Sequence, residues 1–356
     1  MAILFLDGCQ HLSTQQIITK YDVASNYVSG DILSRLSITR LGLSASVYKK
    51  SHTFANTGIF GVNFSAVGVQ SYVAAGVNQL FTTAGVNGNK IAVLEFRDTA
   101  GEAVIRVAGS SGQVVLDVGS GYTSVAAATG GNVASVWNLW EVEASYGATA
   151  VCRVYLSGVV LISYTGSILT SANTGITRAY WSWMRLATTH NGHIHDFYVI
   201  NNAGPAASTL IGSSMQVRTH VVSGDTGTVQ WSPASGSTHY THVDEGSGGD
   251  GHDGTATYVS ANAANLRDLL SVASAAALYS ASEVPRGVQV NAVALGTAGS
   301  LNLLVQVSGG TALSHTTTSA VSTAFQVHRA VFTSAPGGGT WQASSIDNLA
   351  IGIESL

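Results

Sequence analysis

Two glutamates, Glu141 and Glu143, alternate within residues 140–143 (WEVE). Successive side chains of a β-strand point to opposite faces of the sheet, so these two carboxylates are expected to share one face. Two carboxylates that flank a glycosidic bond can hydrolyse it. No third acid follows in residues 144–147 (ASYG), and an acidic rim on a solvent-facing strand is the favoured interpretation. We therefore predict no catalytic residue at this position.

His193 and His195 are separated by one residue in a segment with strand character. On a strand they project from one face, where such a pair can bind a transition metal, and three copies in a trimer could ring an iron or zinc ion. The other interpretation is two surface or interface histidines beside Asp196. Because no cysteine or further acid completes a site, no cofactor is predicted, and a structural metal ion is the alternative.

An acidic, glycine-rich segment contains Asp244, Glu245, Asp250 and Asp253. Carboxylate oxygens on a flexible loop are ligands that calcium accepts. Their spacing does not follow the twelve-residue EF-hand pattern, so the segment predicts at most a loose calcium site. An exposed acidic turn is the favoured interpretation.

Three tryptophans, Trp181, Trp183 and Trp231, could provide flat faces on which sugar rings stack. Trp181 and Trp183 alternate and therefore share a face, which a sandwich core or a subunit interface would also use. Burial in the core is the default interpretation, and glycan stacking is the alternative.

The elements that would position these side chains are strands. The 40 glycines and the abundant valine, threonine and serine favour strands and tight turns. Apolar and polar residues alternate repeatedly, for example in residues 91–96, 102–107, 152–156, 288–293 and 301–307. Short helices are predicted at residues 261–271 and, as a single turn, at residues 31–37. The predicted fold class is all-β, with two antiparallel β-sandwich, jelly-roll-like domains at residues 1–203 and 204–356.

Charge is scarce, because 10% of the residues are charged whereas about 25% is usual in soluble domains. Such a surface resists association poorly, so we expect a subunit that is buried in a larger assembly. The 15 basic residues are spread thinly at a net charge of −4, which argues against a nucleic-acid partner. No run reaches the roughly 18 uncharged apolar residues of a spanning helix, so no membrane insertion is predicted.

Cellular context follows from the cysteines and the first residues. Cys9 and Cys152 lie in apolar runs, where a free cysteine behaves as a small hydrophobic residue, so no disulfide is predicted. Residues 1–8 (MAILFLDG) lack the basic start and the cleavage pattern of a signal peptide. We therefore expect assembly in the cytoplasm of the producing cell.

The first half of the chain resembles the laminin-G-like, concanavalin-type jelly roll with which many phage structural proteins begin. The resemblance rests on residues 4–8 (LFLDG), 137–143 (WNLWEVE), 150–158 (AVCRVYLSG) and 192–199 (GHIHDFYV), where His195 replaces a usual acid. The second half is similar to a module common in phage tail and virion proteins. That similarity rests on residues 210–212 (LIG), 215–218 (MQVR), 230–239 (QWSPASGSTH), 243–245 (VDE), 254–259, 288–291 and 341–352.

These resemblances imply a structural component of a bacteriophage virion, specifically a tail appendage or fibre subunit that contacts the host surface. The implied partners are copies of the chain itself in a homotrimer, other tail or capsid proteins, and a host-surface glycan. The implied location is the virion, after assembly in the host bacterial cytoplasm. Because no catalytic constellation is complete, the chain is also predicted not to be an enzyme. A capsid decoration or head-spike protein is one alternative, and a carbohydrate-binding protein or glycan hydrolase is the alternative of another class.

Overall fold

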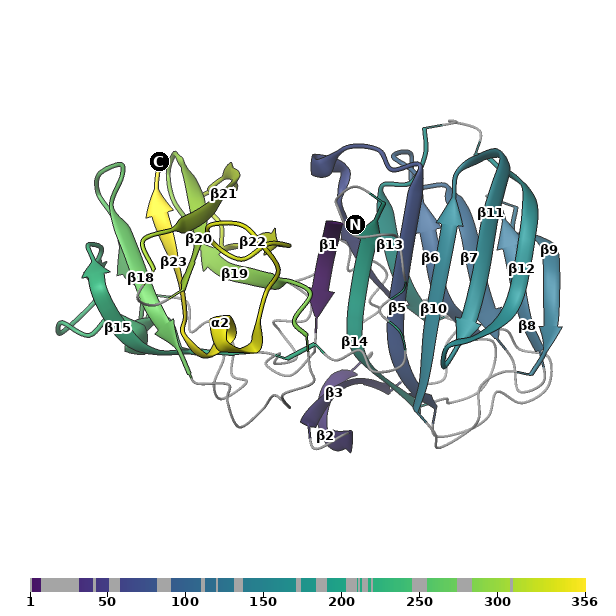
Figure 1. Ribbon diagram of the computed structural model, residues 1–356, viewed down its shortest axis with the longest axis horizontal. Coiled ribbons are helices and arrows are strands. Elements are labelled where there is room, and N and C mark those ends of the chain that lie inside the picture. The colour runs from purple at the N-terminus through teal and green to yellow at the C-terminus, as the bar shows by residue number, and fades with distance from the viewer. Residues whose placement is uncertain are drawn as a thin grey trace. The chain divides into compact units, whose positions relative to one another are not determined.

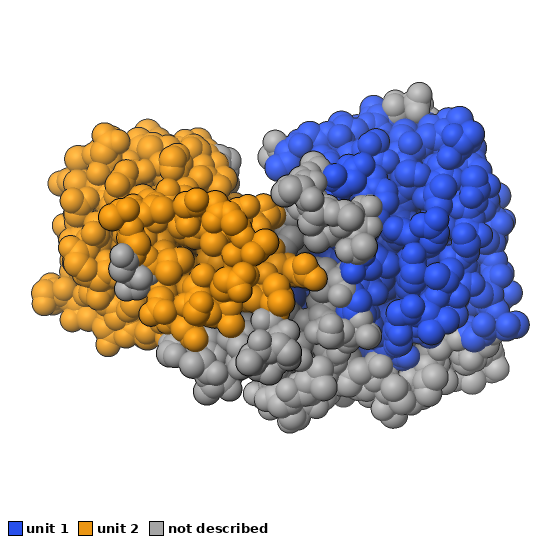
Figure 2. All heavy atoms as spheres, in the orientation of Figure 1, with its two compact units in different colours: residues 1–10, 20–218 blue, residues 11–19, 219–356 orange. Residues whose placement is uncertain are grey.

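The structure is a computed structural model that describes residues 2–7, 32–40, 43–50, 58–81, 91–109, 113–119, 121–130, 137–170, 174–183, 191–202, 210, 212, 217–218, 220–244, 255–273, 284–307 and 310–356. The regular secondary structure of this part of the chain is almost entirely antiparallel sheet, which confirms the predicted all-β, jelly-roll-like fold class (Figure 1). The chain divides into two compact units (Figure 2). Unit 1 comprises residues 1–10 and 20–218, and unit 2 comprises residues 11–19 and 219–356.

Unit 1 is built from strands and one 3-10 turn: β1 (Ala2–Asp7), β2 (Ile32–Arg40), β3 (Leu43–Lys50), β4 (Gly58–Asn63), η1 (Ser65–Val67), β5 (Tyr72–Phe81), β6 (Ile91–Arg97), β7 (Ala103–Gly109), β8 (Gln113–Val118), β9 (Thr123–Thr129), β10 (Trp137–Ser145), β11 (Gly147–Leu156), β12 (Val159–Ile168), β13 (Arg178–Trp183) and β14 (Asn191–Asn201). The eight-stranded sheet has the order β12-β11-β10-β5-β14-β3-β2, and β1 also pairs with β14. The six-stranded sheet has the order β4-β13-β6-β7-β8-β9.

The core of unit 1 lies between these sheets. Trp140 and Val142 of β10 are completely buried and lie opposite Val77 and Ala75 of β5. The two sheets meet where the indole of Trp181 on β13 and the ring of Phe197 on β14 are 4.6 Å apart, in an edge-on arrangement. Alternation along each strand gives these sheets one core face and one outer face. On β10, Trp140, Val142 and Ala144 alternate on the core face and are all 0% exposed.

Unit 2 is built from β15 (Val222–Val229), β16 (Ser232–Pro233), η2 (Tyr240–His242), β17 (Val259–Ser260), β18 (Arg267–Val272), β19 (Val288–Ala294), β20 (Ser300–Val307), β21 (Leu313–Ala320), β22 (Gln326–Phe332), α2 (Ala343–Asp347) and β23 (Leu349–Ser355). Its largest sheet has the order β15-β18-β23-β20-β21, and β16 with β17 and β19 with β22 form two-stranded sheets. The core gathers around Trp341 and Leu303, which are 1% and 0% exposed, and the indole Nε1 of Trp341 donates to the carbonyl of Phe332 over 2.8 Å.

Both predicted helices are wrong. Residues 261–266 form turns, and β18 begins at Arg267. Asp268, Leu269 and Leu270 are all nearly inaccessible, because β18 is an inner strand that pairs with both β15 and β23. Pairing on both edges and burial on both faces override a local sequence that looks helical. Residues 32–37 likewise belong to β2.

The division between the two units falls after Arg218 rather than after Ala203. The backbone N–H of Gly212 donates to Glu141 over 2.9 Å, and that of Val217 donates to Asp196 over 2.9 Å. These two hydrogen bonds attach the segment after β14 to unit 1. Cys152 is a buried free thiol whose pKa is raised by burial, and Cys9 lies outside the described residues. The described part of the chain contains no helix with the length and hydrophobicity that a membrane crossing requires.

His328 on β22 gives unit 2 a predicted dependence on pH. The side chain is 3% exposed, neither ring nitrogen has a hydrogen-bond partner in the described part of the chain, and burial lowers its pKa from 6.5. As the pH falls below 6.5, the unfolded chain therefore takes up a proton before the native one does. We expect the free energy of unfolding of unit 2 to be constant above that pH and to fall below it, by at most about 1.4 kcal/mol per pH unit.

Hydrogen exchange of unit 2 as a function of pH measures this effect. The variant His328→Leu, which cannot be protonated at this position, should lose that part of the pH dependence. An unchanged pH profile in His328→Leu would contradict the assignment.

Candidate functional site

A row of polar side chains crosses the six-stranded sheet. Glu95 on β6 lies opposite Tyr180 on β13 and, on its other side, opposite Arg106 on β7, which lies opposite Asp117 on β8. Directly opposite residues of paired strands point to the same face. The adjacent residues of these strands are buried core side chains: Leu94, Phe96, Val107, Leu116 and Trp181. The polar row, defined as Tyr180, Glu95, Arg106 and Asp117, therefore lies on the face turned away from the eight-stranded sheet.

Arg106 and Asp117 form a buried ion pair. The guanidinium Nε and Nη2 atoms of Arg106 donate to Oδ2 of Asp117 over 3.0 and 2.5 Å, and the two side chains are 8% and 0% exposed. The guanidinium carbon also lies 3.7 Å from the ring centroid of Tyr122, a cation–π contact. Tyr122 follows β8 in a turn and has a positive φ of 52°. The turn thus places an aromatic ring over a desolvated charge.

Arg97 forms the more accessible end of this surface. It follows Glu95 by two residues on β6, so both side chains share a face, and its Nε donates to Oε1 of Glu95. Its guanidinium carbon lies 4.6 Å from the ring centroid of Tyr180. The side chain of Arg97 is 23% exposed, whereas that of Glu95 is 2% exposed. The ring of Tyr180 lies over Gly61 of the neighbouring strand β4. A methyl group at Gly61 would overlap this ring.

Two neighbouring titratable groups on this face, Glu95 and Tyr122, have raised pKa values. Burial raises the pKa of Glu95, and the opposing effects of Arg97 and Arg106 do not offset it. Burial and the nearby Glu95 carboxylate raise the pKa of Tyr122, whose hydroxyl donates to Glu95 over 3.4 Å. A carboxyl with a raised pKa beside a phenol is an arrangement that can take part in general acid–base chemistry.

The predicted glutamate pair lies on the other sheet. Glu141 and Glu143 do share the outer face of the eight-stranded sheet, since Trp140 and Val142 between them are in the core. Tyr198 and the backbone N–H of Gly212 donate to Oε1 of Glu141 over 2.5 and 2.9 Å, and Glu141 is 1% exposed. Glu141 is therefore sealed from solvent, and the pair is not an open acid–base site.

Glu143 instead accepts hydrogen bonds from three neighbours. Arg153 and Tyr155 donate to Oε1 over 2.6 and 2.9 Å, and Tyr72 donates to Oε2 over 2.8 Å. Burial opposes ionisation of Glu143, but these hydrogen bonds outweigh it and lower its pKa. Glu143 is an ionised carboxylate, and both of its oxygens accept hydrogen bonds from neighbouring strands. It therefore links β10 to β11 and β5.

The predicted metal sites fall largely outside the described residues. His193 and His195 lie on β14 opposite Leu80 and Asn78 of β5, and their side chains are not among those described. Of the acidic loop, Glu245, Asp250 and Asp253 lie outside the described residues, and Asp244 lies within them. Within the described residues, no group of three or more His, Cys, Asp and Glu side chains could hold a metal ion.

The three tryptophans have different outcomes. Trp181 is 2% exposed and packs on Phe197 in the core, as the default interpretation has it, and it offers no stacking face for a glycan. The side chain of Trp183 lies outside the described ones. Trp231 in unit 2 is partly exposed, and its indole Nε1 donates to the carbonyl of Leu266 over 3.0 Å.

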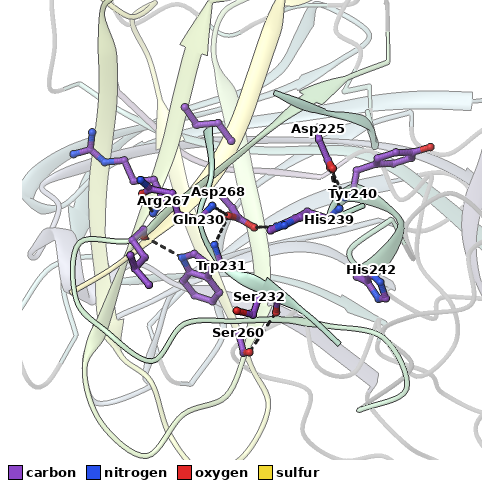
Figure 3. A network of polar contacts seen from close by, with 12 residues as sticks. Asp225, Gln230, Trp231, Ser232, His239, Tyr240, His242, Ser260, Arg267 and Asp268 are labelled. Carbon is purple, nitrogen blue, oxygen red and sulfur yellow. Dashed lines mark hydrogen bonds and ion pairs between the residues drawn. The ribbon is translucent and has the colours of Figure 1, made fainter. Parts of the chain in front are cut away.

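Unit 2 contains a second polar network, centred on Asp268 (Figure 3). Its Oδ1 accepts the backbone N–H groups of Gln230 and Trp231 over 2.6 and 2.7 Å, and its Oδ2 lies 2.6 Å from Nδ1 of His239. Asp225 accepts the backbone N–H of His239 over 2.9 Å. These carboxylates satisfy backbone donors of the segment after β15, so the network fixes that segment on the sheet.

The residues of the polar row were not predicted, although the sequence contains a signal for them. Each charge of the row stands alone inside an apolar strand: residues 93–96 (VLEF), 104–107 (VIRV) and 115–118 (VLDV). A charged side chain between apolar residues on an inner strand is costly unless it is paired, so three such positions indicate one shared network. The pairing register that joins them is visible only in the structure.

Neither a protein-family model nor a curated protein sequence matches the chain. Among solved structures, it is similar to the cellulose-induced protein Cip1, with 16% identity and a TM-score of 0.40 over 53% of this chain and 91% of the other. It is also similar to an endo-β-1,4-glucuronan lyase from the fungus Trichoderma reesei, with 8% identity and a TM-score of 0.41 over 56% and 95%. Alginate lyase Aly36B shows 9% identity and a TM-score of 0.36 over 55% and 95%. At these identities the likeness concerns the fold.

These similarities correct one prediction. The chain was expected not to be an enzyme, yet the solved structures of similar fold include glucuronan and alginate lyases. The prediction relied on the absence of familiar catalytic motifs, and a sheet face can assemble polar groups from separate strands without any such motif.

Proposed function

We propose that unit 1 binds a carbohydrate on the outer face of its six-stranded sheet, at Arg97 and Tyr122, which the buried polar row positions. The observation that carries the proposal is one face with two arginines, each packed on a tyrosine ring, and two carboxylates, from which Arg97 and Tyr122 remain partly exposed. Desolvating so many charges on one face is costly, and such clusters concentrate at functional sites.

The chemistry of the face suits a sugar chain. The ring of Tyr122 can stack on the apolar face of a sugar ring, and the guanidinium of Arg97 can hydrogen-bond to hydroxyls. The phenol of Tyr122, which hydrogen-bonds to Glu95, can in addition exchange a proton with a bound sugar. Because such proton exchange could assist cleavage of a bound polysaccharide, the experiment measures cleavage as well as binding.

The test is a titration of the full chain against a panel of neutral and acidic oligosaccharides, together with assays for new reducing ends and for unsaturated products. We expect at least one glycan to bind, and Tyr122→Ala to weaken it roughly tenfold or more. Tyr155→Ala, which removes a tyrosine from the other sheet, is the matched control. The proposal fails if no glycan binds, or if both variants weaken binding equally.

A second candidate, a structural subunit of a phage particle, is favoured by the low content of charged residues, 10%. The two candidates are compatible, because a glycan-binding domain suits a part that contacts a host surface. Light scattering of the purified chain tests the oligomer, and immuno-electron microscopy of particles tests the location. A monomer that is missing from intact particles would contradict this candidate.

A further inference from the structure

Two arginines face each other at the accessible end of the polar row. Arg178 on β13 lies directly opposite Arg97 on β6, in register with the neighbouring pair of Tyr180 and Glu95. Directly opposite side chains share a face, and like charges in that position repel each other. A pair of this kind requires compensation by negative charge.

The structure compensates Arg97 but not Arg178. Arg97 is ion-paired with Glu95, whereas Nη2 of Arg178 donates to the neutral carbonyl of Thr99 over 3.2 Å. The Nε atom of Arg178 is buried, with no hydrogen-bond partner among the described residues. Gly101 has a φ of +83°, which favours glycine. Because it carries no side chain, it leaves room beside this guanidinium, whose Nη1 would lie 3.1 Å from a methyl group there.

Asp98 of the loop between β6 and β7 is already engaged. Asp98 is completely buried, its Oδ1 accepts the backbone N–H of Glu102 over 2.8 Å, and its Oδ2 accepts the hydroxyl of Thr170 over 2.6 Å. Asp98 therefore stabilises its own turn. The outer face of β13, β6, β7 and β8 carries more positive than negative side chains. The three arginines are Arg97, Arg106 and Arg178, and the two carboxylates are Glu95 and Asp117.

We propose that Arg97 and Arg178 form a subsite for the anionic substituent, a carboxylate or a sulfate, of an acidic glycan. Guanidinium groups bind such oxyanions through paired N–H donors, and Arg178 still has donors for which the described residues provide no acceptor. This inference rests on the proposed function and adds the charge class of the ligand.

The first experiment compares matched ligands on the wild-type chain. Calorimetry measures binding of a uronic-acid oligosaccharide, of the same oligosaccharide after reduction of its carboxyl groups, and of a sulfated neutral oligosaccharide. We expect the carboxyl-reduced ligand to bind at least about tenfold more weakly, and added salt to weaken only the anionic ligands. Comparison of the sulfated oligosaccharide with the uronic-acid oligosaccharide shows whether the subsite prefers a sulfate or a carboxylate.

The second experiment uses variants of the full chain. Arg178→Gln should abolish the preference for the anionic ligand, Arg178→Lys should retain part of it, and Arg153→Gln, which removes one charge from the other sheet, should leave it unchanged. If Arg178→Gln does not fold, the comparison of ligands on the wild type decides alone. Equal binding of the acidic and reduced ligands overturns this inference while glycan binding stands, and no binding of any ligand overturns the proposed function itself.

Discussion

Replacing Arg106 by methionine is expected to lower the free energy of unfolding of unit 1 by about 3–5 kcal/mol. The substitution keeps much of the side-chain volume but leaves the carboxylate of Asp117, which is 0% exposed, without its partner. It also removes the cation–π contact with Tyr122. A single buried charge of this kind costs much more than the pair contributes, because the desolvation of Asp117 is then uncompensated.

Chemical unfolding, followed by hydrogen exchange in peptides of unit 1, measures this loss. The double variant Arg106→Met/Asp117→Leu should be more stable than the single variant, since no buried charge is left unpaired. The pair of Glu143 and the half-exposed Arg153 provides the comparison, and Arg153→Met should change stability by no more than about 1 kcal/mol, because Glu143 keeps its hydrogen bonds to Tyr72 and Tyr155. A loss as small in Arg106→Met as in Arg153→Met would show that Asp117 is not desolvated.

Alternation along the strands was sufficient to predict the fold class. Residues 91–96, 102–107 and 301–307 all form strands as predicted, because each combines alternating or continuous apolar residues with flanking turn residues. The error at residues 261–271 has the opposite cause. An inner strand that is buried on both faces loses alternation, so its sequence cannot be distinguished from a buried helix.

The candidate site was less predictable than the fold. Glu141 and Glu143 attracted attention because they alternate on one strand, yet the structure shows that both are occupied by hydrogen bonds within unit 1. Glu95 and Asp117 come from separate strands with twenty-one residues between them in the chain. Their connection through Arg106 depends on strand register, which local sequence patterns do not specify across a six-stranded sheet.

Glycines explain another part of the site that sequence patterns did not indicate. On both sheets of unit 1, a tyrosine ring lies across a glycine of the neighbouring strand: Tyr180 at Gly61 and Tyr198 at Gly76. The consequences differ. Tyr198 closes over Glu141 and donates to it, whereas Tyr180 lies beneath the guanidinium of Arg97 and leaves that group partly exposed. The same packing therefore buries a carboxylate on each sheet, Glu141 at 1% and Glu95 at 2% exposure, and leaves Arg97 partly exposed beside Tyr180.

Gly352→Ala is expected to destabilise unit 2 by about 3 kcal/mol, the upper end of the range for overpacking. Gly352 lies on β23 opposite Leu269 of β18 and Leu304 of β20. A methyl group at this position would overlap the backbone carbonyl oxygen of Asp268, which, unlike the end of a flexible side chain, cannot turn away. Relief requires β18 to shift, and such a shift moves the carboxylate of Asp268 away from its backbone donors.

Calorimetry of the full chain and hydrogen exchange of β18 and β20 measure the effect in unit 2. Gly227→Ala on β15 is the matched control, because a methyl group at Gly227 meets nothing within 4 Å and its φ is not positive, so the change should be close to neutral. Protection of the amides of Gln230 and Trp231 should fall in Gly352→Ala but not in Gly227→Ala, since both amides donate to Asp268. If both variants are equally stable, β18 and β23 are farther apart than the structure shows, and Asp268 does not link the loop after β15 to the sheet.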